Sequence, residues 1–299
     1  MRITTLSLAT LLIGLMGCSS GLQTVGIRGR EVSKDGADKQ EVSVLSDSQA
    51  QLVDYNIVGK VFYERGVSSF DPVSDRQILK KLLEGAQVIR GDGLIEVQYS
   101  TYGFASRPKK RWASGFVVSR GDVRSELTTN AIGVTILPPM NSSTDIDSAT
   151  MAEENKIMVQ IAQYNLEKAG YYTRPTTQLF PLSAESIQRN ELVGIDKVGA
   201  PEFPYLLLID AKIDGSAHSV GSEATGELAV YLVSKVSKSI IWQNSTSESR
   251  SGAWNLFAAG PIFGILTNLL TNAREEALYK VSKELYDTLP PPTDAVISD

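Results

Sequence analysis

The amino-acid sequence predicts an α+β protein in which a signal peptide and a flexible tether precede two folded domains. Strand-like apolar runs alternate with amphipathic helical patterns over residues 51–290, whereas residues 18–50 carry no sustained period. The composition, 42% hydrophobic and 21% charged, is typical of a globular protein with a core. We expect a small α+β domain over residues 51–122, a larger mixed-sheet α/β domain packed by helices over residues 128–290, and a disordered tail over residues 291–299.

The first seventeen residues predict an export signal. Arg2 supplies a positive charge and the stretch from Leu6 to Met16 is apolar, but it is shorter than the ~20 residues that a membrane span needs. Leu15-Met16-Gly17-Cys18 then resembles the bacterial lipobox, which directs lipid to the cysteine sulfur and cleavage before it. Cys18 is the only cysteine in the sequence, so no disulfide competes for its thiol. The alternatives are a plain secretory signal with an incidental cysteine, or an apolar N-terminal helix of a cytoplasmic protein.

The lipobox resemblance also implies a location. Acyl chains such as palmitate on Cys18 would anchor the mature chain to a membrane, and Ser19 replaces the aspartate that retains many such proteins in the inner membrane. The resemblance thus implies the outer membrane of a diderm, with the domains facing the periplasm. Residues 21–50 mix glycine, serine and charged residues, which predicts a tether of ~30 Å when flexible. The alternative is that the stretch from Val42 to Leu45 forms an edge strand.

The first domain is predicted to follow the order strand, helix, strand, strand. A β-branched run over residues 57–63 predicts the first strand, and the capping-box sequence Ser74-Asp75-Arg76-Gln77 predicts a helix start. The helix has one apolar stripe, formed by Ile78, Leu79, Leu82, Leu83 and Ala86. Gly91-Asp92-Gly93 then turns the chain into strands over residues 94–99 and 113–119.

Two stretches of this domain resemble a family of small bacterial α+β domains typified by YbjQ. They are Gly91-Asp92-Gly93-Leu94-Ile95-Glu96-Val97 and Ala113-Ser114-Gly115-Phe116-Val117-Val118. Some family members are labelled heavy-metal-binding, but this segment has no His or Cys, so we expect no metal site in it. The basic cluster of Arg107, Lys109, Lys110 and Arg111 predicts a solvated loop, with contact to anionic headgroups or an acidic partner as the alternative.

The second domain is predicted to alternate strands and helices. A strand over residues 132–136 ends at prolines, and a helix with apolar Ile157, Met158, Ile161, Leu166 and Ala169 ends at Gly170 as its C-cap. A strand from Tyr171 to Pro175 and a short helix over residues 183–190 follow. The chain then predicts a buried strand over residues 204–213, a hairpin of residues 227–234 and 239–247, and a helix over residues 274–289.

This domain is similar to a group of envelope lipoproteins whose domain resembles the N-terminal domain of TolB and the periplasmic part of the curli secretion protein CsgG. The similarity lies in residues 132–141, 166–172, 206–213 and 240–243. It implies a mixed sheet packed by helices, no catalytic residues, and protein–protein contact in envelope assemblies.

The stretch from Trp254 to Leu270 is almost uncharged and is interrupted by Gly260-Pro261 and Gly264. One interpretation is a loop and helix start buried in the same domain. The alternatives are a self-association surface from Leu256 to Leu270, or a patch that leans on the bilayer.

The sequence shows little catalytic chemistry. His218, the only histidine, lies in a polar stretch that predicts a flexible turn, and no nucleophile motif or phosphate-binding loop occurs. Asp145, Asp147, Glu153 and Glu154 could chelate a hard cation, but acids also favour helix N-termini. We therefore expect no catalytic residues, no cofactor and no metal.

The expected function is that of a non-enzymatic accessory or assembly lipoprotein that binds envelope proteins. The net charge of −5 argues against nucleic acid as a partner. The alternatives are a periplasmic binding module that holds a small ligand, such as a cell-wall fragment, in the cleft between the domains, and a hydrolase with carboxylate chemistry.

Overall fold

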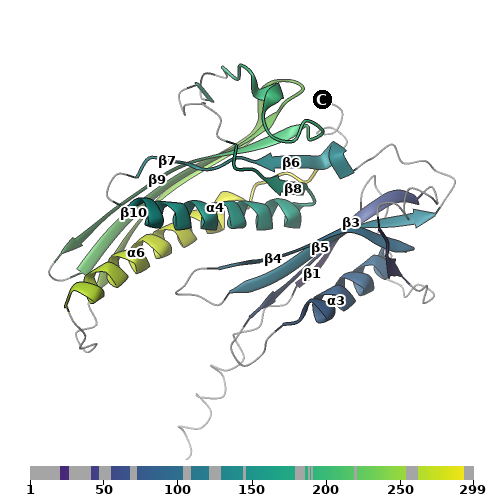
Figure 1. The fold of residues 1–299 in the computed structure, drawn as a ribbon, viewed down its shortest axis with the longest axis horizontal. Helices are drawn as coiled ribbons and strands as arrows, with labels where there is room; N and C mark the ends of the chain where they lie inside the picture. The colour runs from purple at the N-terminus through teal and green to yellow at the C-terminus, as the bar shows by residue number, and fades with distance from the viewer. Residues whose placement is uncertain are drawn as a thin grey trace, which may run out of the picture. The chain divides into compact units, whose positions relative to one another are not determined.

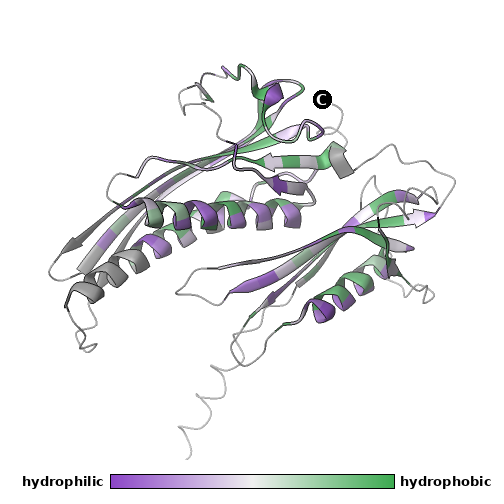
Figure 2. Ribbon diagram, viewed as in Figure 1, coloured by the Kyte–Doolittle hydropathy of each residue, from purple (hydrophilic) through white to green (hydrophobic). Residues whose placement is uncertain are grey.

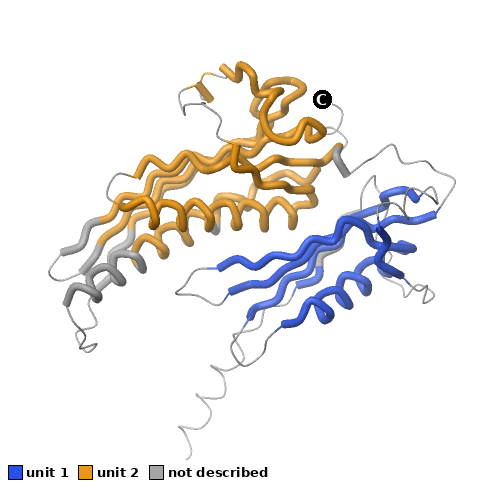
Figure 3. The backbone as a smooth tube through the Cα atoms, in the orientation of Figure 1, with its two compact units in different colours: residues 1–103, 107–127 blue, residues 104–106, 128–299 orange. Residues whose placement is uncertain are grey.

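The computed structural model describes residues 21–26, 42–46, 55–67, 73–103, 109–120, 129–143, 146–178, 186–187, 189, 191–218, 221–253 and 262–292. The chain divides into two compact units, residues 1–103 with 107–127 and residues 104–106 with 128–299 (Figure 3). Each unit has its own sheet, and the described ranges contain three α-helices. The predicted α+β class is confirmed.

In the described residues, unit 1 is a five-stranded sheet with one helix on one face (Figure 1). Its elements are β1 (Gly21–Gly26), β2 (Ser43–Val44), β3 (Tyr55–Gly66), α3 (Asp75–Val88), β4 (Gly93–Tyr102) and β5 (Lys110–Arg120). The sheet order is β1-β3-β5-β4-β2, antiparallel except for the parallel pair of β2 and β4. Ile78 and Leu82 of α3 are fully buried against Val61 and Val117 of the sheet. The three strands and the helix predicted here are confirmed, and the strands are longer than predicted.

The prediction of a continuous tether before residue 51 is wrong for its described parts. Gly21–Gly26 pairs along β3 from Glu64 to Gly59, and Ser43–Val44 pairs with β4 at the other edge of the sheet. The alternative of an edge strand near Val42 is thereby confirmed, and Val42 itself is buried. The physical reason is that β3 and β4 each offer an unpaired row of backbone groups, which short segments of weak strand character can satisfy.

The predicted capping box at the start of α3 is present. Ser74 Oγ accepts a hydrogen bond from Gln77 N at 3.3 Å, and Gln77 Oε1 accepts one from Ser74 N at 3.0 Å. Two amides that the first helical turn leaves unbonded are thus satisfied reciprocally.

Replacing Ser74 with alanine should lower the free energy of unfolding by about 1 kcal/mol, because one amide of the first turn loses its acceptor. Urea unfolding followed by circular dichroism measures this. Ser74→Asp keeps an accepting oxygen and should unfold like the unaltered chain; equal losses for both variants would contradict the capping role.

Unit 2 is a six-stranded mixed sheet with two long helices. Its elements are η1 (Thr129–Ile132), β6 (Gly133–Ile136), β7 (Met140–Asn141), α4 (Ser148–Ala169), β8 (Tyr172–Pro175), η2 (Ile195–Lys197), β9 (Tyr205–His218), β10 (Gly221–Ser234), β11 (Ser239–Ala253) and α6 (Ile262–Leu285). The order is β11-β10-β9-β6-β8, with β7 beside β9. β6 runs parallel to β8 and β9, whereas β9, β10 and β11 are antiparallel.

The helix α6 lies closely on β10 because small residues line the contact. A side chain at Gly226 would come within 3.3 Å of Val281, and Ala224 packs with Ala273 and Ala277. In Figure 2, hydrophilic and hydrophobic residues alternate along α3 and α4, as expected of helices with one buried side. The opposite sheet face is covered at the β6 end by Ile187, Leu192, Ile195 and Val198, which contact Leu206, Leu208 and Tyr231.

Most elements predicted for the second domain are confirmed. Gly170 ends α4 with a left-handed backbone (φ 110°), as its C-cap role predicts. The hairpin of β10 and β11 forms with longer arms than predicted, and of the predicted helix over residues 183–190 only residues 186, 187 and 189 are described, with Ser186 and Ile187 helical.

Two predictions for the second domain need correction. His218 does not lie in a flexible turn: its backbone ends β9 and pairs with Gly221 of β10. The closing helix spans 262–285 rather than 274–289, because no proline follows Pro261 before residue 290 and the helix continues through Gly264 into the predicted helical stripe. Residues 254–261 and the side chains of residues 262–272 lie outside the described part, so the role predicted for the stretch from Leu256 to Leu270 stays a prediction.

Candidate functional site

The acids near the start of α4 serve separate purposes. Asp147 is the N-cap, and its Oδ1 accepts a hydrogen bond from Thr150 N at 2.7 Å. This bond holds the pKa of the Asp147 carboxyl below its usual value. Glu153 pairs with Lys156 at 3.2 Å on the exposed side of the helix. Asp145 lies outside the described residues, and within the described ranges no group of three His, Cys, Asp or Glu side chains could hold a metal.

Glu154, by contrast, forms a buried ion pair with Arg274 of α6. Arg274 Nε lies 2.7 Å from Glu154 Oε1, and a second guanidinium nitrogen donates to Oε2 at 3.1 Å. The Arg274 side chain is 2% exposed and that of Glu154 10%. The two-pronged geometry matches the planar fork of arginine to the carboxylate, which is the arrangement that lets such a pair remain charged inside a protein.

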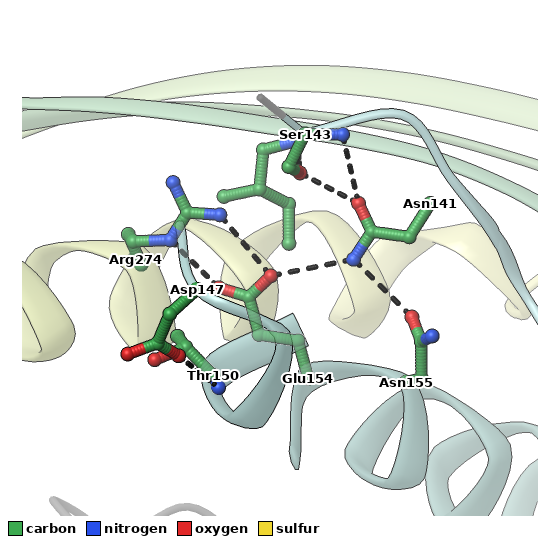
Figure 4. A network of polar contacts seen from close by, with 8 residues as sticks. Asn141, Ser143, Asp147, Thr150, Glu154, Asn155 and Arg274 are labelled. Atoms are coloured by element: carbon green, nitrogen blue, oxygen red, sulfur yellow. Dashed lines mark hydrogen bonds and ion pairs between the residues drawn. The ribbon is translucent and has the colours of Figure 1, made fainter. Parts of the chain in front are cut away.

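A chain of hydrogen bonds extends this pair to the sheet (Figure 4). Asn141 Nδ2 donates to Glu154 Oε2 at 3.4 Å, and Asn141 Oδ1 accepts from Ser143 Oγ at 2.6 Å. Ser143 Oγ in turn accepts from Ile213 N of β9 at 2.9 Å. Helix α6, helix α4, the segment after β7 and strand β9 are therefore joined by one continuous polar network.

The polar network holds helices α4 and α6 against the sheet. Both oxygens of the Glu154 carboxylate accept hydrogen bonds, from Arg274 and from Asn141, so the network fixes the orientation of this carboxylate. The groove beside the pair, between α4 and α6, holds only about 50 Å³, far below the ~300 Å³ of a small-molecule site. We infer that the pair sets the position of both helices on the sheet.

The sheet face opposite α6 carries a hollow of about 470 Å³. Three adjacent strands form it where Asp210 of β9, Ala229 of β10 and Ser245 of β11 stand side by side in register. It is lined by Ser142, Asp210, Ala211, Lys212, Glu227, Leu228, Ala229, Ser245, Thr246 and Ser247. The small Ala229 side chain, with a longer polar residue on each neighbouring strand, leaves the hollow open at its centre.

The hollow contains charges of both signs. Burial raises the pKa of the Asp210 carboxyl, and the described residues offer this carboxylate no hydrogen bond or ion pair. Lys212 lies 3.0 Å from Asp214, and this hydrogen-bonded pair, together with Glu227, raises the pKa of the Lys212 ammonium. A half-buried carboxylate without a partner costs stability, and such groups gather at binding sites.

Asp210→Asn should therefore stabilise the protein at neutral pH. The folded-state pKa of Asp210 lies above its ordinary value of 3.8, so the ionised form opposes folding at neutral pH and this penalty fades as the pH falls through the raised pKa. Chemical unfolding of the unaltered chain and of Asp210→Asn at neutral pH and near pH 3.5 measures the difference in their free energies of unfolding. The variant should be more stable at neutral pH and equally stable in acid. Glu223→Gln, on the same face but outside the hollow, is the control, and an equal gain for it would contradict the explanation.

The structure places the other predicted residues as follows. Cys18 and Arg107 lie outside the described residues. Two members of the basic cluster serve the fold: Lys110 pairs with Glu64 at 3.2 Å, and Arg111 pairs with Asp75 at 2.6 Å. The side chain of His218 is not described. Among the described residues, no helix has the length and apolar character that a membrane crossing needs.

No protein-family model matches the chain, and no curated protein matches it. Several solved structures are similar to part of the chain. A candidate neuraminyllactose-binding hemagglutinin homolog from Helicobacter pylori is 13% identical, with a TM-score of 0.36 over 56% of this chain and 89% of that one. The lipoprotein GNA1162 from Neisseria meningitidis is 18% identical, with a TM-score of 0.29 over 47% of this chain and 95% of that one. A Xanthomonas campestris protein of the family DUF330 is 14% identical, with a TM-score of 0.29 over 52% and 81% of the two chains. At these values the matches carry no argument about function.

Proposed function

We propose that the chain is a non-enzymatic outer-membrane lipoprotein that acts in the periplasm as an accessory or assembly component, with unit 2 binding protein partners. The observation that carries the proposal is Leu15-Met16-Gly17-Cys18 behind a short apolar run, which predicts a lipid anchor on Cys18. The net charge of −5 favours partners other than nucleic acid. The relationships to TolB, CsgG and YbjQ domains stay predictions from the sequence.

Unit 2 supports binding rather than catalysis. The buried carboxylate of Glu154 is committed to Arg274, whereas the hollow on the open sheet face presents Asp210, Glu227 and serine hydroxyls. Such a surface offers hydrogen-bond donors and acceptors on a rigid sheet, which suits recognition of a polar partner surface.

Crosslinking in intact cells followed by capture of the tagged chain tests the proposal. We expect specific envelope proteins with the unaltered chain and with Glu223→Arg, and their loss with Glu227→Arg. Both glutamates are exposed on the same face of β10, but only Glu227 lines the hollow, so the two variants make the same chemical change. Thermal unfolding verifies that both variants are folded.

If Glu227→Arg captured the same proteins as the unaltered chain, the hollow would not be the surface that binds them. Turnover of a substrate that a single carboxylate substitution abolishes would overturn the non-enzymatic function itself.

A second candidate function is binding of a small envelope ligand such as a cell-wall fragment. The observation in its favour is the volume of the hollow, about 470 Å³, which lies within the range of ~300–1,000 Å³ typical of small-molecule sites. Its carboxylates, the Lys212 ammonium and the hydroxyls of Ser142, Ser245 and Ser247 complement the amide, hydroxyl and charged groups of such ligands. The hollow lies on unit 2 alone.

Purified muropeptides test this second function. At ~100 times its dissociation constant a ligand adds ~2.7 kcal/mol to the free energy of unfolding, which raises the melting temperature measurably. The rise should persist in Glu223→Arg and disappear in Glu227→Arg. No rise for the unaltered chain at millimolar muropeptide would remove this candidate and leave the first one standing.

A further inference from the structure

Strand β11 forms one edge of the unit 2 sheet and is unusually long for an edge strand. It contains 15 residues, whereas strands average ~5–6, and it contains no proline. Among the described residues β10 is its one strand neighbour. The register with β10 shifts near Ile241, so the stretch from Ser245 to Ala253 lies beyond this irregularity and pairs regularly with β10. A long, regular edge without proline can pair with a further strand.

The register shows which residues of β11 direct their backbone groups to the open edge. Successive residues of an antiparallel strand point alternately to its two sides. Ile213 N donates to Ser143 Oγ, so the backbone N–H of Ile213 points away from β10. Its register partner Gly226 therefore directs its N–H and C=O toward β11, where Glu248 lies opposite. The next residue along β11, Ser249, therefore points its N–H and C=O outward, as do the alternate residues Ser245, Ser247 and Ser251. Consistently, Ser245 N donates to the Asn244 side chain rather than to β10.

We propose that β11 pairs in antiparallel fashion with β11 of a second copy of this chain, about a two-fold axis at Ser249. In this register Ser249 lies opposite Ser249, Ser247 opposite Ser251, and Ser245 opposite Ala253. The matched outward-facing backbone groups can then form a continuous ladder, and nine residues of each strand take part, from Ser245 to Ala253.

Charge selects this register over its neighbours. With the axis at Ser249, Glu248 of one copy lies opposite Arg250 of the other, twice over, which is the favourable cross-strand arrangement. Moving the axis by one residue would place Glu248 opposite Glu248, or Arg250 opposite Arg250. In either shifted register the outward-facing serines would still pair, but two like charges would face each other across the axis.

The helix that covers β10 and β11 leaves room for the second copy. Trp242 of β11 stacks on Tyr286, Lys280 lies 4.0 Å from Glu248, and a side chain at Gly226 of β10 would meet Val281, so the axis of α6 lies over both strands. Neighbouring strands lie ~4.8 Å apart. An α6 helix centred between β10 and β11 would therefore lie ~5 Å from the two-fold axis, and the two α6 helices of the dimer would lie ~10 Å apart. That is a normal distance for two packed helices, ~8–10 Å. The proposal rests on this geometry and does not depend on the lipid anchor or on the hollow.

Cysteine crosslinking of the full chain in isolated membranes tests the register. In the proposed pair the two Ser249 Cα atoms lie ~5.5 Å apart, within the ~4.4–6.8 Å that a disulfide spans. With a mild oxidant, Ser249→Cys should run as a dimer. The matched control Ser245→Cys, on the same strand and the same face, should stay monomeric because its two copies would be ~27 Å apart. Ser247→Cys combined with Ser251→Cys should crosslink again, and the unaltered chain reports any background from Cys18.

Charge exchange tests the same pairing without a crosslink. In detergent, light scattering after size exclusion should give a dimer for the unaltered chain, a loss of dimer for Glu248→Arg or Arg250→Glu alone, and its recovery when both changes are combined. A Ser249→Cys chain that stays monomeric, or that crosslinks no better than Ser245→Cys, would overturn the proposal. So would a dimer that neither single charge change weakens.

Discussion

Replacing Cys18 with serine should release the protein from the membrane fraction or leave it as uncleaved precursor. The physical reason is that acyl chains contribute ~0.8 kcal/mol per buried CH₂, and stable anchoring takes more than one chain, so loss of the acceptor sulfur removes the whole attachment. Cys18 is the only cysteine, so incorporation of radiolabelled palmitate, carried as an ester on a diacylglyceryl group that a thioether joins to the sulfur, should fall to background at the same time. Fractionation of cells and mass determination of the N-terminus measure both effects.

Ser19→Asp is the matched control for this experiment. It keeps the acceptor sulfur and should remain lipidated, while the lipobox resemblance implies that it moves from the outer to the inner membrane. A Cys18→Ser chain that stays membrane-bound and processed like the unaltered one would show that the anchor is not the lipid predicted here.

Breaking the Glu154–Arg274 pair should be the most destabilising single change considered. Arg274→Met leaves the Glu154 carboxylate buried without its counter-charge, and removal of one partner from a buried ion pair costs ~3–5 kcal/mol. Glu154→Leu should cost a similar amount because it leaves the guanidinium buried and uncompensated. Denaturant unfolding measures the loss, followed by the fluorescence of Trp242 in a background that carries Trp112→Phe and Trp254→Phe.

Two comparisons separate this effect from a general loss of charge. Glu153→Gln, one residue earlier on α4, breaks an exposed pair with Lys156 and should cost less than ~1 kcal/mol. Glu154→Leu combined with Arg274→Met should recover much of the stability, because apolar side chains of similar volume can replace a buried pair. If the double change were as damaging as the two single changes added together, the pair would not act as a unit.

The elements with strong local signals were predictable from the sequence. The capping box at Ser74, the C-cap at Gly170 and the apolar run of β9 each carry their physical cause within a few residues. Strands β1 and β2 were missed as parts of the fold because their stability comes from the unpaired edges of β3 and β4, which residues far along the chain supply. The polar composition before residue 51 predicts a tether because it shows only the local sequence and not the distant strands with which these segments pair.

The candidate site was less predictable. Glu154 is one of four acids near the predicted start of the helix, but its partner Arg274 lies 120 residues away, and no local pattern connects them. The hollow depends on the register that sets Asp210, Ala229 and Ser245 side by side, which a sequence without the sheet order does not reveal. The one available signal is Asp210, a carboxylate directly after the apolar run from Leu206 to Ile209.

If Cys18 carries the lipid proposed above, the position of β1 limits how far the protein can reach from the membrane. Only Ser19 and Ser20 separate that residue from Gly21, the first residue paired with β3, so the three intervening steps span at most ~11 Å. The Gly21 end of β1 would therefore be held at the depth of the lipid headgroups. One corner of the unit 1 sheet would then lie against the bilayer surface. Partners of unit 1 would have to approach parallel to the membrane or from the side of the unit that faces away from it.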